Sequence, residues 1–357
     1  MGDDYQGTCM TRYFCTYFDR NYLSRGLALY RSLQRACPSF ELWILCLDAV
    51  CHRVLSELRL SGMYLISLEE LEESDHQLYA VKNTRSLLEY YFTCSPCLPS
   101  FVLGRHTHVD RITYLDADLY FFRDPSDLFD EIEHSSIAII PHRFHPTFVD
   151  REQFGIYNVG WVSFRRDEPG IACLSKWREQ CLDWCYVRCE TDRFADQKYL
   201  DRWPADFSNV VVIQHKGANL APWNVANYHI RHTESGICVE NEPLIFFHFH
   251  YLKQVNKWVY NPGLSEYKTS LVRVLRDYIY VPYIHALRDA EAEVHAVLPS
   301  EYTHSREVRG NSMDEPEAHS RWTVSGVAHS VRNVVGFWRG VVAGDYVVVT
   351  HEQGEGR

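Results

Sequence analysis

The first half of the chain alternates apolar-rich runs with segments that carry apolar residues at helical spacing. Residues 13–18 and 41–47 are runs typical of buried strands, whereas residues 23–36 and 51–60 have the spacing of amphipathic helices. Strands that alternate with helices of this length are typical of a mostly parallel sheet whose faces are covered by helices. The sequence therefore predicts an α/β fold with a mostly parallel central sheet.

The same alternation continues along the chain. Strands are expected at residues 63–66, 112–115, 136–140, 157–164, 210–213 and 244–247, and helices at 82–94, 171–190 and from 195 onward. Prolines are expected to end two of these helices, near Pro96 and at Trp203-Pro204, because proline lacks a backbone N–H. A long helical pattern then runs from about residue 265 to the mid-290s. The predicted organisation is a catalytic α/β domain at 1–265 and a helical appendage with a polar, irregular tail at 266–357.

Composition limits the class of protein. The 357 residues are 46% hydrophobic, which suffices for a sizeable core. A formal net charge of -11 argues against a protein that coats nucleic acid, because phosphate neutralisation requires a basic surface. Residues 1–12 contain no apolar segment of a secretory signal, and the chain has no run of 18 apolar residues. A cytoplasmic protein with reduced cysteines is therefore expected.

Two aspartates directly follow the apolar run 112–115. Asp116 and Asp118 are separated by one residue, and the apolar residues 119–122 come next. Ionised carboxylates are costly in apolar surroundings unless a cation or a polar network receives them. Both can reach one Mg²⁺ or Mn²⁺ ion if the backbone leaves the strand pleat at this point. The alternative is a strand-ending turn in which the aspartates cap backbone amides.

Other polar side chains stand at the ends of expected strands. Asp19 follows the first strand and His248 follows the last, and ligands of open α/β sheets bind beyond the carboxyl ends of the strands. Strand alternation places His248 and His250 on one face, and an imidazole nitrogen suits Mn²⁺. Asp116, Asp118 and His248 are therefore expected to share one metal ion. A structural hydrogen bond is the alternative role for either histidine.

These motifs together resemble the glycosyltransferases of the GT-A fold, and specifically the retaining group around family 8, to which glycogenin belongs. The resemblance extends over residues 12–262. It rests on five elements, which are Asp19-Arg20-Asn21-Tyr22, Asp116-Ala117-Asp118, Tyr157-Asn158-Val159-Gly160, Asp196-Gln197 and His248-Phe249. That family usually continues with Gly and then Lys-Pro-Trp, where this chain has His250-Tyr251 and then Lys257-Trp258. The chain thus resembles a divergent member, and the resemblance implies a GT-A (Rossmann-like) sheet flanked by helices.

The resemblance implies a metal-dependent, retaining transfer of a sugar from a nucleotide-diphosphate donor to a glycan or another hydroxyl acceptor. UDP is the expected nucleotide, and Mn²⁺ or Mg²⁺ is the implied metal, with Asp116, Asp118 and His248 as its ligands. The implied catalytic residues are Asp196, Gln197 and Asp116, and the choice between a front-face mechanism and a double displacement stays open. As an alternative, Asp196 and Gln197 form a helix N-terminal pair.

The resemblance also implies contacts to the nucleotide sugar. The implied positions are Tyr17, Asp19, Asn21, Tyr22, Asn158 and Gly160. Lys82 and Arg85, three apart on one expected helix, and Lys253 are further candidates for contacts to the phosphates or the donor hydroxyls. A solvated surface is the alternative for these three cations. Trp161 and Trp223 can stack on a sugar ring or pack in the core.

Two other classes of protein stay open. A metal-dependent phosphohydrolase or nucleotidyltransferase also uses Asp-x-Asp and histidine, but the chain lacks a glycine-rich phosphate loop. A non-catalytic sugar-nucleotide-binding protein is the second alternative, although a pure binder has no need of a cation at the diphosphate. Peripheral contact with the inner face of a membrane is a further expectation, based on residues 271–297 and on Phe337-Trp338-Arg339. Mixed charges there favour a packing helix.

Overall fold

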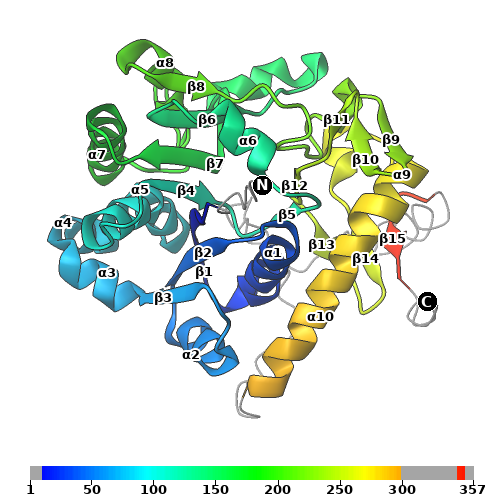
Figure 1. The fold of residues 1–357 in the computed structure, drawn as a ribbon, viewed down its shortest axis with the longest axis horizontal. Coiled ribbons are helices and arrows are strands. Elements are labelled where there is room, and N and C mark those ends of the chain that lie inside the picture. The colour runs from blue at the N-terminus through cyan, green and yellow to red at the C-terminus, as the bar shows by residue number, and fades with distance from the viewer. Residues whose placement is uncertain (1–9, 299–343, 350–357) are drawn as a thin grey trace, which may run out of the picture.

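A seven-stranded sheet forms the centre of the protein (Figure 1), and the computed structural model describes residues 10–298 and 344–349. The strand order is β3-β2-β1-β4-β7-β6-β8. These strands are β1 (Arg12–Phe18), β2 (Phe40–Cys46), β3 (Met63–Ser67), β4 (Arg111–Leu115), β6 (Ile137–Pro141), β7 (Tyr157–Arg165) and β8 (Val210–Val212). Strand β7 runs antiparallel to β4 and β6, whereas the other neighbouring pairs are parallel. The predicted α/β fold with a mostly parallel sheet is therefore confirmed.

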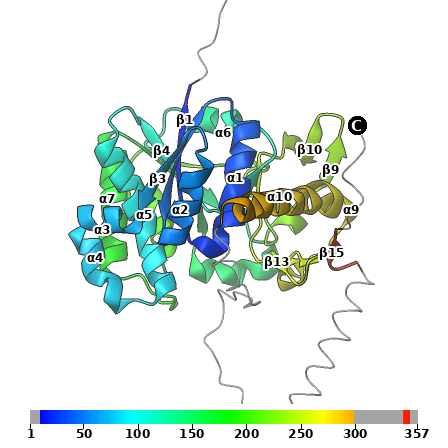
Figure 2. The ribbon, with the colours of Figure 1, turned by 90° about the horizontal axis from the view of Figure 1, so that it is seen from below.

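Helices cover both faces of this sheet (Figures 1 and 2). The α-helices are α1 (Leu23–Ala36), α2 (Ala49–Leu58), α3 (Leu68–Ser74), α4 (His76–Val81), α5 (Leu87–Arg105), α6 (Ser126–Glu131), α7 (Glu168–Asp183), α8 (Trp203–Asp206), α9 (Arg273–Leu275) and α10 (Val281–Val297). Helices α3, α4, α5 and α7 share one apolar cluster with the sheet, and α1, α2, α6 and α10 share a second. Cys15 of β1 belongs to the first cluster, whereas Phe14 and Phe18 belong to the second. This division follows from the alternation of side chains across a strand.

Short elements complete the described chain. Helical turns are η1 (Arg20–Tyr22), η2 (Lys82–Thr84), η3 (Pro146–Phe154), η4 (Lys198–Arg202), η5 (Val225–Asn227), η6 (Leu264–Tyr267) and η7 (Arg276–Tyr280). The described residues also form three small sheets. The first pairs β5 (Leu119–Phe121) with β12 (Phe246–His248), and the second contains β9 (Ile230–Thr233), β10 (Gly236–Val239) and β11 (Glu242–Pro243). The third contains β13 (Lys253–Gln254), β14 (Val259–Asn261) and β15 (Val347–Val348). Strand β12 was expected in the main sheet, but it pairs antiparallel with β5 instead.

Helix α5 is longer than the sequence predicts. Ser86 and Glu89 form a capping box at its start, and the helix then continues through Pro96 and Pro99. A proline inside a helix costs about 3 kcal/mol because it removes a backbone hydrogen bond and crowds the preceding turn. This part of α5 is buried in the first apolar cluster, and burial of each large apolar side chain contributes about 1.5–3 kcal/mol. Packing therefore outweighs the prolines, and the prediction that the helix stops near Pro96 is wrong.

Two other predicted helix ends differ from the structure in part or in full. The turn η4 ends at Arg202, directly before Trp203-Pro204 as expected, but helix α8 begins there, because the missing N–H of proline is harmless in the first helical turn. Helix α7 ends at Asp183, before the expected end at residue 190. The chain after α7 is irregular up to the turn η4.

Helix α10 lies along α1 in both ribbon views (Figures 1 and 2). Arg31 of α1 and Glu293 of α10 form an ion pair of 2.6 Å. Ala290 and Val294 of α10 belong to the same apolar cluster as α1. The helical segment after residue 265 therefore packs on the α/β body, while the domain boundary at that residue stays a prediction.

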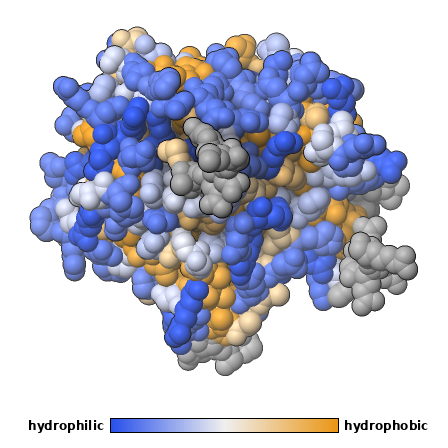
Figure 3. Space-filling model, in the orientation of Figure 1, coloured by the Kyte–Doolittle hydropathy of each residue, from blue (hydrophilic) through white to orange (hydrophobic). Residues whose placement is uncertain are grey.

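The membrane expectation concerns segments that are only partly described. None of the helices in residues 10–298 and 344–349 has the length and apolar character needed to cross a membrane. Hydrophilic residues cover most of the face shown in Figure 3. Phe337-Trp338-Arg339 and the polar stretch 300–320 lie outside the described residues.

Candidate metal centre

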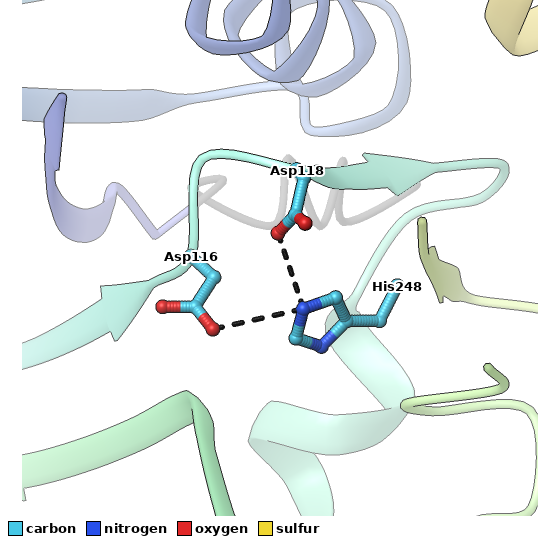
Figure 4. A group of neighbouring side chains, drawn as sticks. All are labelled: Asp116, Asp118 and His248. Carbon is cyan, nitrogen blue, oxygen red and sulfur yellow. Dashed lines mark ion pairs between the residues drawn. The ribbon is translucent and has the colours of Figure 1, made fainter. Parts of the chain in front are cut away.

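Asp116, Asp118 and His248 lie together at the end of β4 (Figure 4). The two aspartates occupy the connection between β4 and β5. Strand β12 pairs antiparallel with β5 and sets His248 opposite Leu119. One ligand atom from each of the three side chains lies within 4.8 Å of the others. The juxtaposition predicted from the sequence is therefore present, and the β5–β12 pairing produces it.

The histidine lies between two carboxylates. His248 Nε2 is 3.1 Å from Asp118 Oδ1 and 3.7 Å from Asp116 Oδ2. The side chain of His248 is only 4% exposed, and that of Asp118 is 15% exposed. Burial lowers the pKa of His248, but the charge and hydrogen bond of Asp118, together with the charge of Asp116, outweigh burial and raise it. Without a metal ion, the positive imidazolium and the carboxylates therefore compensate one another.

The two aspartates differ in their electrostatics. Burial raises the pKa of Asp116 to about 6; the nearby charge of His248 opposes this shift, and that of Asp118 adds to it. Burial also acts to raise the pKa of Asp118, but the charge and hydrogen bond of His248 lower it to about 2. Asp118 is therefore ionised throughout the neutral range, whereas Asp116 is protonated more readily.

Backbone and side-chain hydrogen bonds hold the aspartate connection. Tyr114 donates its hydroxyl to Asp116 Oδ1 at 3.0 Å, and the Asp116 amide donates to the carbonyl of Gly160 at 3.2 Å. The amide of Phe249 donates to the Asp118 carbonyl at 3.0 Å. Sequence reasoning missed Tyr114. Its position two residues before Asp116 on a strand was the available signal, since such residues share a face.

The donor set of this group fits a hard or borderline divalent ion. Two carboxylate oxygens suit Mg²⁺ and Mn²⁺, and an imidazole nitrogen shifts the preference toward Mn²⁺. Within residues 10–298 and 344–349, no other three acidic, histidine or cysteine residues come together in this way. The three side chains therefore form the candidate metal centre of the described chain.

Asn158 and Gly160 of β7 lie directly behind His248. Asn158 Oδ1 is 3.3 Å from His248 Nδ1 and accepts the amide of Gly160 at 3.1 Å. A methyl group at Gly160 would come within 2.5 Å of Asn158 Oδ1 and 2.9 Å of His248 Nδ1. Glycine is therefore required here because the imidazole and the amide occupy the space of a side chain.

Gly160→Ala is expected to weaken metal binding and to destabilise the fold by about 1–3 kcal/mol, the usual range for an overpacked site. The added methyl group must displace the His248 imidazole or the Asn158 amide, since both lie closer than a real contact allows. Isothermal titration with Mn²⁺ and urea unfolding measure the two effects.

Gly104→Ala in α5 is the matched control for this substitution. Among the described residues, no atom apart from the adjoining residues and the nearby backbone of α5 lies within 4 Å of a methyl group built at Gly104. Alanine in a helix is up to about 1 kcal/mol more favourable than glycine, so this variant is expected to be equally or more stable, with unchanged Mn²⁺ affinity. Wild-type Mn²⁺ binding by Gly160→Ala would contradict the crowding seen behind His248.

Asp196 is a buried carboxyl near this centre. It is 5% exposed, and burial raises its pKa to about 7; a hydrogen bond from Ser95 opposes the shift, and Asp116 adds to it. Ser95 also lies 3.1 Å from the hydroxyl of Tyr17. Sequence reasoning missed Ser95, because the helix that carries it was expected to end there.

Gln197 is oriented by its neighbours. Its Nε2 donates to the carbonyl of Phe154 at 3.1 Å, and its Oε1 is 3.5 Å from Asn158 Nδ2. The structure therefore brings Gln197 to Asn158, which itself contacts His248.

The expected nucleotide-binding residues after β1 make mostly local contacts. Asp19 caps η1: its two oxygens accept the backbone and side-chain N–H groups of Asn21, each at 2.9 Å. The ring of Tyr22 lies under the guanidinium of Arg25, 4.6 Å away. Burial raises the pKa of Tyr22 to about 12, with Asp118 and Asp116 adding to the shift. Tyr22 therefore lies near the metal centre, whereas Asp19 is engaged in capping.

The three cations expected at the donor have other contacts. Lys82 forms an ion pair of 2.7 Å with the buried Glu72. Arg85 donates to the carbonyls of Cys181 at 3.0 Å and Leu182 at 2.7 Å. Lys82 and Arg85 do not share a helix, because Lys82 lies in η2 and α5 begins only at Leu87, so that part of the prediction is wrong.

Lys253, the third of these cations, is exposed on β13. Of the two tryptophans, Trp161 is fully buried and stacks on Phe246. Trp223 also lies in an apolar cluster, but its ring contacts His248 edge-on, with ring centroids 5.0 Å apart. Packing is therefore the role of Trp161, and Trp223 forms one wall around the imidazole.

Comparisons with known proteins give relatives and a likeness of fold. No family model matches the chain. The fold is similar to that of the galactosyltransferase LgtC, solved with donor and acceptor sugar analogs, at 16% identity and a TM-score of 0.46 over 82% of this chain and 99% of LgtC. The uncharacterized protein YfnD of Bacillus subtilis (strain 168) is 29% identical over 292 residues, which are 81% of this chain and 93% of YfnD.

A second relative from the same organism, the uncharacterized protein YfnF, is more similar in sequence. It is 34% identical over 248 residues, which are 67% of this chain and 81% of YfnF. On this similarity, the chain belongs to the same protein family as YfnF of Bacillus subtilis.

Proposed function

We propose that this protein is a metal-dependent, retaining glycosyltransferase of the GT-A fold, related to family 8. It would move a sugar from a UDP-sugar to a glycan or another hydroxyl acceptor. The observation that carries the proposal is the convergence of Asp116, Asp118 and His248 at the carboxyl end of β4, a position where open α/β sheets bind ligands. Retaining sugar transfer is proposed as the reaction because of the motifs that resemble family 8.

Each residue of the centre has a distinct task in this proposal. Asp118, ionised at neutral pH, and His248 Nε2 hold a Mn²⁺ or Mg²⁺ ion, and Asp116 supplies the third protein ligand. A bound divalent cation offsets the negative charge that develops on the departing diphosphate. Tyr114 fixes the Asp116 carboxylate by its hydrogen bond, so that one oxygen faces the centre.

Asp196 and Gln197 are proposed to face the donor sugar. Burial raises the pKa of Asp196 to about 7, so the carboxyl is mostly protonated below that pH and mostly ionised above it. The protonated form donates a hydrogen bond and is a poor nucleophile. Below pH 7 it therefore favours a front-face mechanism, in which the leaving phosphate helps to deprotonate the acceptor hydroxyl, over a double displacement.

The test is hydrolysis of a panel of nucleotide sugars with Mn²⁺, with the released nucleotide and phosphate separated by chromatography. Slow release of UDP and free sugar from one UDP-sugar is expected, and EDTA is expected to stop it. Release of UMP and sugar 1-phosphate, with no free sugar, would instead show cleavage of the diphosphate by a phosphohydrolase or a nucleotidyltransferase. Binding and turnover of no nucleotide sugar would overturn the proposal.

Arg25 is a candidate for contact with the diphosphate that the sequence motifs did not reveal. Its guanidinium donates to the carbonyl of Leu252 at 2.9 Å and lies over the ring of Tyr22. Behind the larger effects of burial and His248, Arg25 also helps to lower the pKa of Asp118. Its positive charge is therefore close to the metal centre. Leu252, which accepts its hydrogen bond, lies in the segment where this chain departs from the Lys-Pro-Trp loop of family 8.

Arg25→Met is expected to raise the KM for the UDP-sugar about tenfold or more with a smaller change in kcat, because a charge-assisted hydrogen bond contributes about 1.5–3 kcal/mol of binding. Steady-state kinetics at saturating Mn²⁺ measure both constants. Arg53→Met in α2 is the control, since Arg53 is exposed and pairs with Glu57 on its own helix. An unchanged KM in Arg25→Met would remove this arginine from the donor site.

A further inference from the structure

We propose that Asn158 and His142 form a hydrogen-bond chain that positions His248 as a metal ligand. The chain keeps the proton of the neutral imidazole on Nδ1 and leaves the lone pair of Nε2 for the cation that Asp116 and Asp118 would also bind. This inference rests on the proposed function, because it assigns positioning residues to the same metal centre.

The orientation of the Asn158 amide is fixed by its own strand. The backbone amide of Gly160 points at one end of the Asn158 side chain, 3.1 Å away, and a donor requires an acceptor there. That end must therefore be Oδ1. The same oxygen is 3.3 Å from His248 Nδ1, so the ring nitrogen has to donate to it.

The other end of the amide meets two acceptors. Asn158 Nδ2 is 3.3 Å from His142 Nε2 and 3.5 Å from Gln197 Oε1. Gln197 presents its oxygen because its Nε2 donates to the carbonyl of Phe154. Both hydrogens of the Asn158 amide therefore have a partner, and the side chain cannot be turned over without losing these bonds.

His142 closes the chain at its far end. Its Nδ1 is 3.2 Å from the carbonyl of Ile156, which can only accept, so Nδ1 carries the proton and Nε2 is left to accept from Asn158. The direction of every hydrogen bond is thereby set, from the Ile156 carbonyl through His142 and Asn158 to His248.

Burial protects this chain from water. His142 is 5% exposed, Asn158 is 6% exposed and His248 is 3% exposed. Hydrogen bonds in such surroundings are stronger than in water, and a lost partner is not replaced by solvent. The strand geometry also supports the arrangement, because the pairing of β6 and β7 shifts register at Ile140 and sets it opposite Asn158.

The consequence concerns the nitrogen that faces the carboxylates. A neutral imidazole that carries its proton on Nε2 cannot bind a cation with that atom. Partners of this kind behind a metal-binding histidine typically contribute 10–100-fold to metal affinity, because they fix both the tautomer and the ring orientation. Loss of the acceptor at Nδ1 is therefore expected to weaken Mn²⁺ binding without removing any of the three ligands.

The test measures the Mn²⁺ dissociation constant by electron paramagnetic resonance of free Mn²⁺, together with urea unfolding of each metal-free protein. Asn158→Leu has nearly the size of asparagine but offers no acceptor, and it is expected to bind Mn²⁺ about 10–100-fold more weakly than the wild type. Asn158→Asp keeps an acceptor for both His248 Nδ1 and Gly160, and it is expected to bind Mn²⁺ at least as tightly as the wild type.

Asn224→Leu is the matched control for a purely structural effect. Asn224 is fully buried beside the same chain and donates to the carbonyl of His142 at 2.8 Å, and its other hydrogen bonds go to the backbone of Asn219 and Ala221. This variant is expected to be less stable and to retain the wild-type Mn²⁺ affinity. Should Asn158→Leu fail to fold, His142→Leu provides the second measurement, with an expected loss of about tenfold.

Wild-type affinity in a folded Asn158→Leu, or in the fallback His142→Leu, would overturn the inference. Equal losses of Mn²⁺ affinity in Asn158→Leu and Asn224→Leu would also overturn it, since the loss would then result from lower stability and not from the missing acceptor at His248 Nδ1. An Asn158→Asp protein as weak as Asn158→Leu would overturn it as well. A wild-type protein that binds no Mn²⁺ would overturn the proposed function, and this inference with it.

Discussion

Asp118→Asn is expected to lower kcat/KM for the UDP-sugar by about a thousandfold. Several kcal/mol of charge stabilisation depend on the cation at this centre, and each 1.4 kcal/mol corresponds to a factor of ten in rate. Asparagine is close in size to aspartate but lacks its charge. Asp118 keeps that charge at neutral pH because, although burial acts to raise its pKa, His248 lowers the pKa to about 2. Nucleotide release at fixed Mn²⁺ measures the loss, and a Mn²⁺ titration shows whether affinity falls with it.

Asp206→Asn is the control for this variant. Asp206 lies on α8, is 42% exposed and pairs with Arg202 at 2.9 Å on the surface. The same change of charge there is expected to leave both activity and Mn²⁺ affinity unaltered. An Asp118→Asn enzyme with wild-type turnover at the same Mn²⁺ concentration would show that the carboxylate holds no catalytic ion.

Asp196→Asn is expected to be more stable than the wild type at pH 8 and about equally stable at pH 4. The unfolded carboxyl ionises near its usual pKa of 3.8, whereas burial raises the folded pKa to about 7. Between these values the folded state holds a proton that the unfolded state releases, so the free energy of unfolding of the wild type falls as pH rises. The two pKa values differ by about three units, which corresponds to a loss of roughly 4 kcal/mol in the free energy of unfolding. This loss is complete only above the folded pKa.

Urea unfolding of both proteins at pH 4, 5, 6, 7 and 8 in EDTA measures this difference. The gain in stability of the asparagine variant should grow with pH up to about 7 and then level off. Asp206→Asn is again the control: Arg202 lowers the pKa of this exposed carboxyl, so any effect of the substitution should have the opposite sign. A stability difference that does not change with pH would show that Asp196 is already ionised in the folded protein.

The regular part of the fold was predictable from the sequence. The helix expected at residues 23–36 has those bounds in the structure, and the strand expected at 13–18 differs by one residue. Both are long enough for their apolar spacing to be unambiguous. The meeting of Asp116, Asp118 and His248 was also predictable, because carboxylates and histidine beside apolar strands require a special environment.

Short or tertiary features escaped prediction. Strand β5 has three residues, too few for a period, and its pairing with β12 depends on contacts between distant segments. Arg85 was expected at the donor, but it donates to carbonyls at the end of α7 that the sequence could not place beside it. The hydrogen bonds of Asn158 belong to the same class, since His142, Gln197 and His248 meet only in the folded chain.

The pairing of β5 with β12 has a consequence for biosynthesis. A nascent chain on the ribosome exposes Asp116 and Asp118 long before His248 has been made, and the imidazole reaches them only when β12 adds to β5. The full ligand set of the proposed metal centre therefore forms late in maturation, and a product cut short before residue 246 would keep its acidic pair without the imidazole nitrogen.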